Sequence, residues 1–376
     1  HCRVTEGLCG LMLGATLRGR ILGGVSSREI SGYRNGRAMA LNGSGLVSAV
    51  IPTRNRPELV MKAVLSALRQ SYTRMEVIVV IDGEDRATEE RLAVIEDGRL
   101  RVISLAVNMG GSAARNVGVR AANGEWIAFL DDDDEWMPQK ITLQLETARA
   151  GGEAFPVVSS SLIVRTQALD FTGPRRQYEA GKPVSEYLFC RSEFADGAYA
   201  MQTSTLFMRR DMMLAVPFRA GLKMHQDWDW LLRASHHPGV NFQVLAEPLT
   251  IFRVEDGRSS VSRSTGWEFS TQWAREMRPY FTPKAHSFFL ATECMSRAVA
   301  SKAGAAIYMR IAWDFFTQGA PTFRSFLWMA SFVCVPRGVR TRTREFLRSF
   351  STARQTRRGI LTKPGSAAAA LPDTGF

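Results

Sequence analysis

The sequence predicts an α/β fold in which a mostly parallel central sheet has helices on both faces, followed by a helical C-terminal extension. From Leu46 onward, short apolar runs with strand-like composition alternate with segments of helical periodicity, which is typical of a parallel sheet covered by helices. Four such strand and helix steps follow one another within about 85 residues. Beyond Trp267 the pattern is helical to about Phe350.

Strands are expected where an apolar run is bounded by turn residues, and helices where apolar residues recur at three- and four-residue spacing. The expected strands are 47–51, 77–81, 100–105, 126–130, 157–165, 203–208, 242–245 and 249–254. The expected helices begin at Pro57 and otherwise cover 88–95, 112–122, 138–150 and 228–234. Residues 170–200 are rich in glycine, proline and charge, so we expect a mobile loop there.

The net charge of +12 is concentrated near the C-terminus, where residues 337–358 hold eight arginines and one acid. This segment suits an anionic surface, but no nucleic-acid-binding module accompanies it, so no nucleic-acid partner is expected. The five cysteines are far apart and form no C-x-x-C pair, which predicts neither a disulfide framework nor a zinc site and favours a reducing, cytoplasmic setting. No run of 18 apolar residues occurs, so no transmembrane helix is expected.

Four consecutive carboxylates, residues 131–134, close the apolar run at 125–130. One pair of like charges ~4 Å apart costs roughly 4 kcal/mol at an effective dielectric constant of 20, so a cation or open water must offset the charge of this segment. The carboxyl end of a buried strand is where open α/β sheets bind their ligands. The segment therefore points to a divalent metal site, with a solvated acidic turn as the alternative.

Three other metal or nucleotide motifs are excluded by neighbouring residues. An EF-hand needs glycine at the sixth loop position, where Trp136 stands. No G-x-x-x-x-G-K-[ST] segment exists to partner a Walker B acid, and no G-x-G-x-x-G segment follows the first strand.

Five segments taken together resemble the family 2 glycosyltransferases, which have a Rossmann-like, A-type fold that binds nucleotide sugars. The segments are Ile51-Pro-Thr-Arg-Asn-Arg56, Val79-Val-Ile-Asp-Gly83, Asn108-Met-Gly-Gly-Ser-Ala-Ala-Arg-Asn116, the acidic run 131–134 and Gln226-Asp-Trp228. The resemblance covers residues 47–254. It implies a catalytic domain at 46–262. Composition and periodicity predict an extension at 1–45 with little structure, a helical region at 263–350 and a disordered tail at 351–376.

The resemblance also implies roles for individual residues. Asp133 binds a divalent Mn²⁺ or Mg²⁺ ion together with Asp131. The residues implied to hold the nucleotide are Pro52, Thr53, Asn55, Asp82, Arg115, Asp131 and Asp132. Two simpler interpretations stay open, with Asp82 as a turn former before Gly83 and the glycine pair 110–111 needed only for close packing.

Asp227 is implied to be the catalytic base, and a single base facing the anomeric carbon implies inversion. Aspartate is also a favoured helix N-cap, so that role is the alternative for Asp227. Asp229 and Arg233 are spaced i, i+4, which predicts a pair on the helix surface.

The predicted activity is metal-dependent, inverting transfer from a nucleotide-diphosphate sugar to a saccharide or lipid-linked acceptor. The alternatives are a catalytically silent nucleotide-sugar-binding scaffold and, on weaker grounds, a sugar nucleotidyltransferase. Residues 326–335 beside the basic tail have the composition of an anchor on an anionic membrane, which would place the protein at the inner face of the membrane. A buried helix followed by a solvated tail is the other interpretation.

Overall fold

The computed structural model describes residues 45–167, 170–174, 176–191, 200–254, 266–336, 338–340 and 342–343. These residues belong to one compact unit, which spans Gly43–Phe376. The extension expected at 1–45, apart from residue 45, and the tail expected at 351–376 lie outside the described residues.

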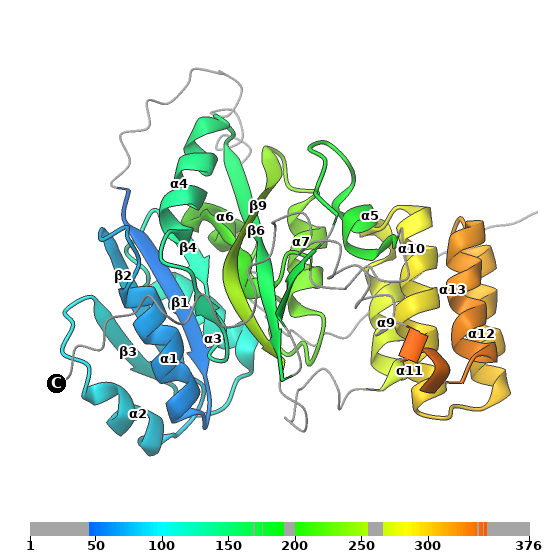
Figure 1. Cartoon of the computed structure of the whole chain (residues 1–376), viewed down its shortest axis with the longest axis horizontal. Helices are drawn as coiled ribbons and strands as arrows, with labels where there is room; N and C mark the ends of the chain where they lie inside the picture. The colour runs from blue at the N-terminus through cyan, green and yellow to red at the C-terminus, as the bar shows by residue number, and fades with distance from the viewer. Residues whose placement is uncertain are drawn as a thin grey trace, which may run out of the picture. The chain divides into compact units, whose positions relative to one another are not determined.

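The first half of the sheet is parallel, as predicted (Figure 1). Its strands lie in the order β3-β2-β1-β4. Their bounds are β1 Val47–Thr53, β2 Met75–Ile81, β3 Leu100–Ser104 and β4 Trp126–Phe129. The helices that alternate with them are α1 Pro57–Leu68, α2 Arg86–Ala93 and α3 Gly111–Ala121, and α4 Lys140–Ala150 follows a short strand, β5 Glu135–Trp136.

The second half extends the same sheet with mixed strand directions. β8 joins β4 in antiparallel orientation, β6 and β9 pair in parallel, and β5 closes the order β4-β8-β6-β9-β5, while β7 pairs with β6. The bounds are β6 Phe155–Thr166, β7 Asp170–Gly173, β8 Phe207–Arg209 and β9 Val240–Val254. Helices α5 Val184–Phe189, α6 Arg210–Ala215 and α7 Gln226–Ala234 occur in this half.

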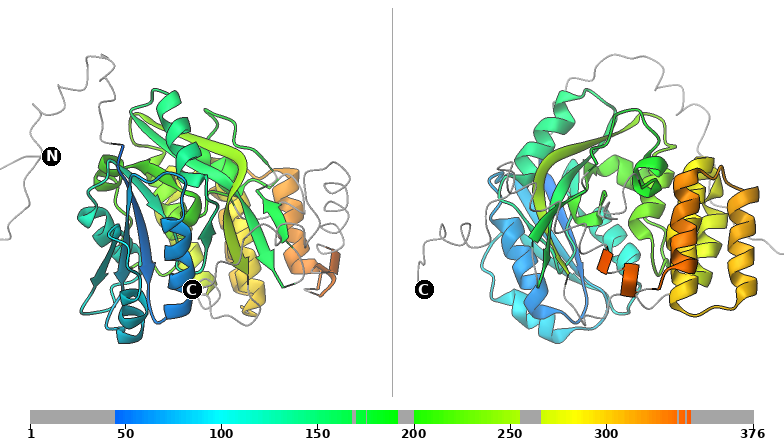
Figure 2. Two further views of the ribbon diagram at one scale, coloured as in Figure 1. Left: turned by 60° about the vertical axis from the view of Figure 1, so that its left-hand side comes forward. Right: turned by 45° about the vertical axis from the view of Figure 1, so that its right-hand side comes forward.

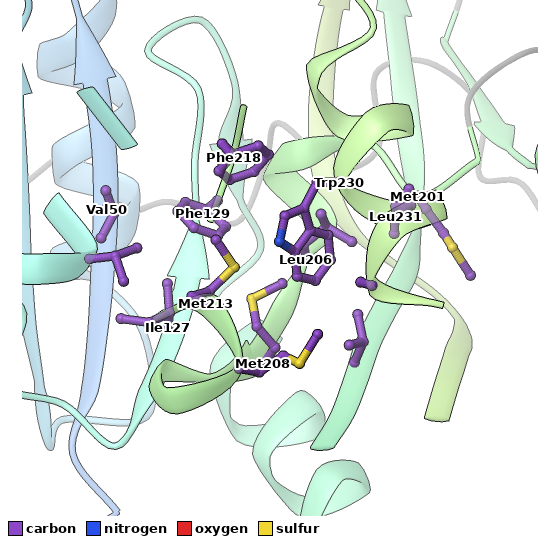
Figure 3. Packing of buried hydrophobic residues seen from close by; sticks show 14 of the residues in the cluster. Val50, Ile127, Phe129, Met201, Leu206, Met208, Met213, Phe218, Trp230 and Leu231 are labelled. Atoms are coloured by element: carbon purple, nitrogen blue, oxygen red, sulfur yellow. The ribbon is translucent and has the colours of Figure 1, made fainter. Parts of the chain in front are cut away.

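Helices cover both faces of the sheet, because side chains on one strand alternate between two cores. Val50 and Val80 face one core together with residues of α3, α6 and α7. Ala49 and Val79 face the other, together with residues of α1 and α4. Figure 3 shows how bulky residues from β4, β8 and α7 fill the first core.

Three sequence expectations in the second half are wrong. Residues 203–205 form a 3₁₀ turn and not a strand, because the Thr205 hydroxyl and N–H both bond back to the Gln202 carbonyl, in competition with a sheet ladder. The strands expected at 242–245 and 249–254 are one strand, since residues 246 and 247 are absorbed by irregular pairing opposite Ser160 and Ser161.

The expected loop at 170–200 also contains regular structure. β7 and α5 lie within it, and residues 192–199 are outside the described part. Val184 and Tyr187 on α5 are buried in the first core, which compensates the ordering entropy of that short helix.

The C-terminal region is helical, as expected, through the residues described there (Figure 2). Its helices are α9 Trp267–Glu276, α10 Pro283–Phe289, a π-helical turn at Leu290–Cys294, α11 Met295–Ala300, α12 Ala305–Thr317 and α13 Phe323–Cys334. They form a third apolar core, which Phe189 of α5 and Leu232 of α7 join. Within the described residues, no helix has the length and apolar content needed to cross a bilayer.

Lys140, the first residue of α4, is fully buried. Its Nζ lies 2.6 Å from Gln144 Oε1 and 4.3 Å from the centre of the Trp136 ring. Burial lowers the pKa of this ammonium well below its usual value. The unfolded chain therefore binds more protons than the native state between the two pKa values, and the free energy of unfolding rises with pH across that window.

Replacing Lys140 with methionine is expected to raise the free energy of unfolding at neutral pH by about 1 kcal/mol, because a buried cationic group with one neutral partner is removed. Urea unfolding at pH 7 and at alkaline pH checks this. The wild-type protein gains stability as pH rises and Lys140→Met lacks that gain. Equal pH dependence in the two proteins would contradict the burial argument.

Candidate active site

The acidic segment leaves the carboxyl end of β4 and its four carboxylates meet different surroundings. The side chains of Asp131 and Asp133 are 32% and 28% exposed, whereas Asp132 and Asp134 are buried. Ser204 holds the segment through two hydrogen bonds. Its hydroxyl accepts from the Asp131 N–H at 3.0 Å and donates to Asp134 Oδ2 at 2.6 Å. The two exposed carboxylates are thereby presented to solvent.

Asp132 ties the acidic segment to the turn after β1. Its Oδ2 accepts from the Thr53 hydroxyl at 2.8 Å and its Oδ1 from Arg56 Nη1 at 2.9 Å. The same Arg56 nitrogen lies 3.5 Å from Asp133 Oδ2. Burial raises the pKa of Asp132, although Arg56 and Thr53 act in the opposite direction. The sequence prediction did not include Arg56, even though it ends the segment 51–56 that carried the resemblance.

Asp134 is the least hydrated of the four acids. Burial, followed by the charges of Asp133 and Asp131, raises its pKa well above the usual range. Its Oδ1 has no hydrogen-bond partner among the described residues. Because burial favours the neutral form of Asp134, the repulsion expected from four adjacent carboxylates is reduced.

Arg115 on α3 joins the acidic segment to the start of α7. Its guanidinium pairs with Asp131 Oδ1, and its Nη1 donates to Gln226 Oε1 at 2.8 Å. Arg115 is almost fully buried and its guanidinium carbon lies 5.6 Å from the centre of the Phe218 ring. Residues more than a hundred positions apart along the chain are therefore held at one edge of the sheet.

Asp82 holds the loop that enters α3. Its two oxygens accept from the Met109 N–H at 2.7 Å and the Gly110 N–H at 2.8 Å. Gly110 has φ 87°, a backbone conformation that glycine adopts without strain. The nucleotide contact predicted for Asp82 would use the remaining lone pairs of a carboxylate that already organises this loop.

Pro52 and Thr53 end β1, and the Thr53 hydroxyl donates to Asp132. Asn55 follows in the left-handed region, with φ 54°, and its N–H donates to Asp85 Oδ2 at 2.6 Å. Asp85 also caps α2 through Thr88. The β1 turn, the acidic segment and the loop before α3 thus surround the same edge of the sheet.

Asp227 lies in the first turn of α7, where His225 and not Asp227 is the N-cap residue, so the N-cap alternative is wrong. Burial, and then the charge of Asp131, raises the pKa of Asp227 to about 6, against the opposing effects of the Trp228 N–H and Arg115. His225 adopts φ 63° and stacks on Trp228 with ring centres 4.8 Å apart. A carboxylate with this pKa is mostly ionised at neutral pH and is still a better base than an ordinary aspartate.

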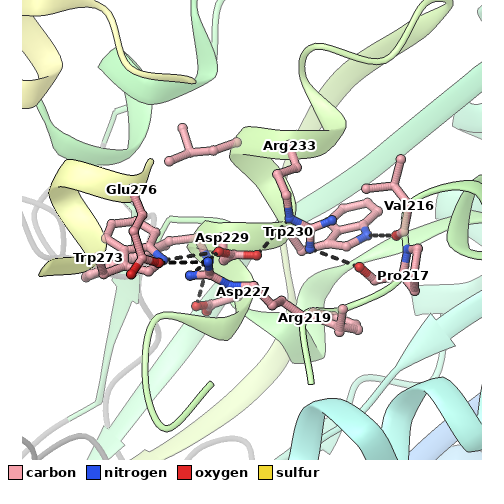
Figure 4. A network of polar contacts seen from close by, with 12 residues as sticks. Val216, Pro217, Arg219, Asp227, Asp229, Trp230, Arg233, Trp273 and Glu276 are labelled. Carbon is pink, nitrogen blue, oxygen red and sulfur yellow. Dashed lines mark hydrogen bonds and ion pairs between the residues drawn. The ribbon is translucent and has the colours of Figure 1, made fainter. Parts of the chain in front are cut away.

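Asp229 makes the predicted pair with Arg233 at 2.8 Å, but the expected surface location is wrong. The carboxylate is fully buried and also pairs with Arg219 at 3.0 Å and with the Trp273 indole N–H at 3.1 Å (Figure 4). Trp273 belongs to α9, which covers this side of α7 and could not be foreseen from helix spacing. The helix that carries Asp227 is thus fastened to the C-terminal region.

Asp229→Asn is expected to lower the free energy of unfolding by about 3 kcal/mol, because it leaves two arginines without their shared buried anion. Thermal or urea unfolding measures the loss. The exposed Asp170→Asn, at the start of β7, is the matched control and should change stability by less than about 0.5 kcal/mol. A loss at Asp229 no larger than in this control would contradict the buried network.

The donor set can be tested for a metal. The described residues contain no group of three or more histidine, cysteine, aspartate or glutamate side chains arranged as a complete metal site. Mg²⁺ in nucleotide sites commonly takes one or two protein carboxylates and completes its shell with phosphate oxygens and water. The two partly exposed carboxylates, Asp131 and Asp133, match that mode.

Comparisons with known proteins show which proteins this chain resembles. A sequence model of the family described as Glycosyl transferase family 2 matches residues 48–211. The amylovoran biosynthesis glycosyltransferase AmsB of Erwinia amylovora is 27% identical over 62% of this chain and 78% of that protein. The succinoglycan biosynthesis protein ExoO of Rhizobium meliloti is 40% identical over 30% of this chain, but only 32% of ExoO is covered.

A third relative is a named transferase of Escherichia coli, the UDP-Glc:alpha-D-GlcNAc-diphosphoundecaprenol beta-1,3-glucosyltransferase WfgD. It is 31% identical over 27% of this chain and 40% of that protein. The solved structure of S. aureus TarS 1–349 in complex with UDP-GlcNAc shares the fold, with a TM-score of 0.50, 18% identity and coverage of 76% of this chain and 84% of that one.

The parallel half-sheet with its acidic segment at the end of β4, together with these matches, defines a glycosyltransferase of the A-type fold. Residues 48–211 carry the sequence pattern of glycosyltransferase family 2.

Proposed function

We propose that this protein transfers a sugar, with inversion, from a nucleotide-diphosphate donor to a hydroxyl of a saccharide or lipid-linked glycan in polysaccharide biosynthesis. The observation that carries the proposal is the bridge made by Arg115. It joins Asp131 of the acidic segment to Gln226, the residue beside Asp227. Donor-binding and acceptor-activating groups are thereby brought to one place, as direct displacement requires.

The donor nucleotide would lie over the carboxyl ends of β1, β2 and β4. Pro52 and Thr53 at the end of β1 and Asn55 after it would lie on one side of the nucleotide, and Asp82 and Arg115 would lie on the side of α3. Asp132 supports the β1 turn from below through Thr53 and Arg56. We assign to these residues the recognition of base, ribose and diphosphate.

Asp133 and Asp131 would hold Mn²⁺ or Mg²⁺, because they are the two carboxylates of the segment that solvent reaches. A metal bound there would neutralise the negative charge that accumulates on the departing nucleoside diphosphate. Arg56 and Arg115, which contact the same carboxylates, add fixed positive charge beside the diphosphate.

Asp227 would act as the general base. It accepts the proton of the acceptor hydroxyl while the oxygen forms a bond to the anomeric carbon and the bond from that carbon to the diphosphate breaks. The raised pKa of about 6 suits this role, since the group is ionised before the reaction and basic enough to take the proton. One base on the face opposite the leaving group gives inversion.

A lipid-linked acceptor is supported by the name of the E. coli relative WfgD, whose acceptor is a diphosphoundecaprenol. Such an acceptor sits at a membrane, and the C-terminal region of this chain is strongly basic. We therefore place the protein in the cytoplasm at the inner face of the membrane, in peripheral contact with anionic lipid.

The test begins with a panel of nucleotide sugars and Mn²⁺, in which the true donor raises the melting temperature by mass action. Release of nucleoside diphosphate is then followed with saccharide and lipid-linked acceptors, and the product's anomeric configuration is read by nuclear magnetic resonance. Inverted product supports the proposal. A donor that binds tightly but is never turned over with any acceptor would instead identify a nucleotide-sugar-binding scaffold.

A further inference from the structure

Helices α12 and α13 expose large apolar side chains on the side that faces away from the third core. Trp313 and Phe323 are 69% and 76% exposed. The set, which we name the hairpin face, comprises Met309, Trp313 and Phe316 of α12 and Phe323, Phe326 and Leu327 of α13. Six exposed side chains of this size on two consecutive helices exceed the scattered apolar residues of an ordinary surface.

The spacing shows that this exposure is organised. Residues 309, 313 and 316 recur at four and three positions and so form one stripe along α12. Ile311 and Phe315 point the other way and are buried in the third core. The helix is therefore apolar on two sides, although only one of them has a partner among the described residues.

The two helices follow one another in the chain, joined by residues 318–322, and both pack against α11 and the π-helical turn at Leu290–Cys294 (Figure 2). Phe316 and Phe323 flank this connection, and Trp313 and Phe326 lie one turn further along each helix. Four aromatic side chains are thus concentrated at one end of the helical hairpin. Tryptophan and phenylalanine are the residues that interfacial helices insert at the boundary of headgroups and acyl chains.

The exposed charges on α12, on α13 and on the segments next to them in the chain have one sign. Lys302, Arg310, Arg324 and Arg342 are exposed. The single acid between residues 301 and 343 is Asp314, which is buried and pairs with Arg275 at 2.9 Å. A partner must therefore be apolar at its centre and anionic at its rim.

We propose that the hairpin face inserts into the headgroup region of an anionic membrane and holds the catalytic domain there. A second copy of the chain is a poorer occupant, because a symmetric contact would bring Arg310 and Arg324 against like charges of the other copy. The sequence pointed only to 326–335 and the basic tail, whereas the structure adds α12. The inference rests on the proposed function in one respect: a lipid-linked acceptor lies at the membrane, where this contact would hold the enzyme.

The experiment measures sedimentation of the full chain with sucrose-loaded vesicles. Vesicles of phosphatidylcholine with about a third phosphatidylglycerol should capture the wild-type protein more strongly than phosphatidylcholine alone. The double variant Trp313→Ser/Phe323→Ser should bind the anionic vesicles at least about tenfold more weakly, since two large apolar groups no longer enter the bilayer. The matched control Val94→Ser/Leu214→Ser, at exposed apolar positions of the catalytic domain, should bind as the wild type does.

Two results overturn the proposal. One is absence of wild-type binding, or equal binding by the Trp313/Phe323 variant. The other is a wild-type dimer in analytical ultracentrifugation that the same variant converts to a monomer without any vesicle binding, which assigns the face to a second copy. Turnover with a water-soluble saccharide acceptor separates this inference from the proposed function. The Trp313/Phe323 variant should retain that turnover. If the wild-type protein binds vesicles but shows no turnover, only the proposed transfer reaction is contradicted.

Discussion

Asp227→Asn is expected to lower the rate of sugar transfer by about 10²–10⁴-fold while donor binding is retained, because the amide cannot take the proton of the acceptor hydroxyl. The measurement is the rate of nucleoside diphosphate release at saturating donor, alongside the donor's effect on the melting temperature. The exposed Asp170→Asn is the matched control and should behave as the wild type does. Transfer at the wild-type rate by Asp227→Asn would contradict the assignment of Asp227 as the general base.

The pH dependence gives an independent test of the same group. The pKa of Asp227 is raised to about 6, chiefly by burial. A base must be unprotonated, so kcat/KM should be constant above that pKa and fall about tenfold for each pH unit below it. An ordinary aspartate would instead give a fall near pH 4.

The free energy of unfolding of the Asp227→Asn variant should stay the same or rise, although its activity falls. A carboxyl with a raised native pKa binds more protons in the native state than in the unfolded chain between about pH 4 and 6, so its ionisation destabilises the native state at pH 7. Asp227→Asn should therefore be at least as stable as the wild type at pH 7. Loss of activity with unchanged or raised melting temperature separates a chemical role from misfolding.

Asp133→Ala is expected to abolish metal-dependent turnover, with a loss of about 10³-fold or more, since several kcal/mol of leaving-group stabilisation are removed. Wild-type activity should vanish in excess chelator and return with Mn²⁺ or Mg²⁺, whereas the variant should gain nothing from either ion. Isothermal titration with Mn²⁺ and nucleoside diphosphate measures the binding directly.

Asp134→Asn is the control within the same segment. Burial raises the pKa of Asp134 and so favours its neutral form, and asparagine reproduces its size and its capacity to accept from Ser204. Its activity should stay within about tenfold of the wild type. Equal losses in Asp133→Ala and Asp134→Asn, or full wild-type activity in chelator, would contradict the assignment of the metal to Asp133.

The parallel half of the sheet and its polar strand ends could be predicted from the chain because they depend on local patterns. Val47–Thr53, Met75–Ile81 and Trp126–Phe129 are apolar runs that the structure buries on both faces, and turn residues bound them. Once parallel strands are inferred, their carboxyl ends must meet at one edge, which brings Thr53 and the acidic segment together. The second half of the sheet could be predicted less well from the sequence. Strand length there depends on partner strands such as β6 and on a bulge that no local pattern marks.

The candidate site residues could be proposed from the sequence, but their electrostatic surroundings could not. Four adjacent aspartates required some compensation of charge, and the chain alone suggested a cation. In the tertiary structure, Arg115 and Arg56 pair with carboxylates of the segment, and burial of Asp134 favours its neutral form. Ser204, which supports the segment, lies 73 residues from Asp131, so no spacing rule connects the two.

By itself the sequence determined which residue types end the strands, the order of the motifs and hence the class of reaction. Only the tertiary structure decided that Asp229 is buried beneath Trp273, that Arg115 bridges Asp131 and Gln226, and that α12 adds its exposed aromatic residues to those of α13. The physical reason is that secondary structure and strand-end chemistry follow from near neighbours in the chain. Burial, pKa shifts and exposed faces follow from which distant segments pack together.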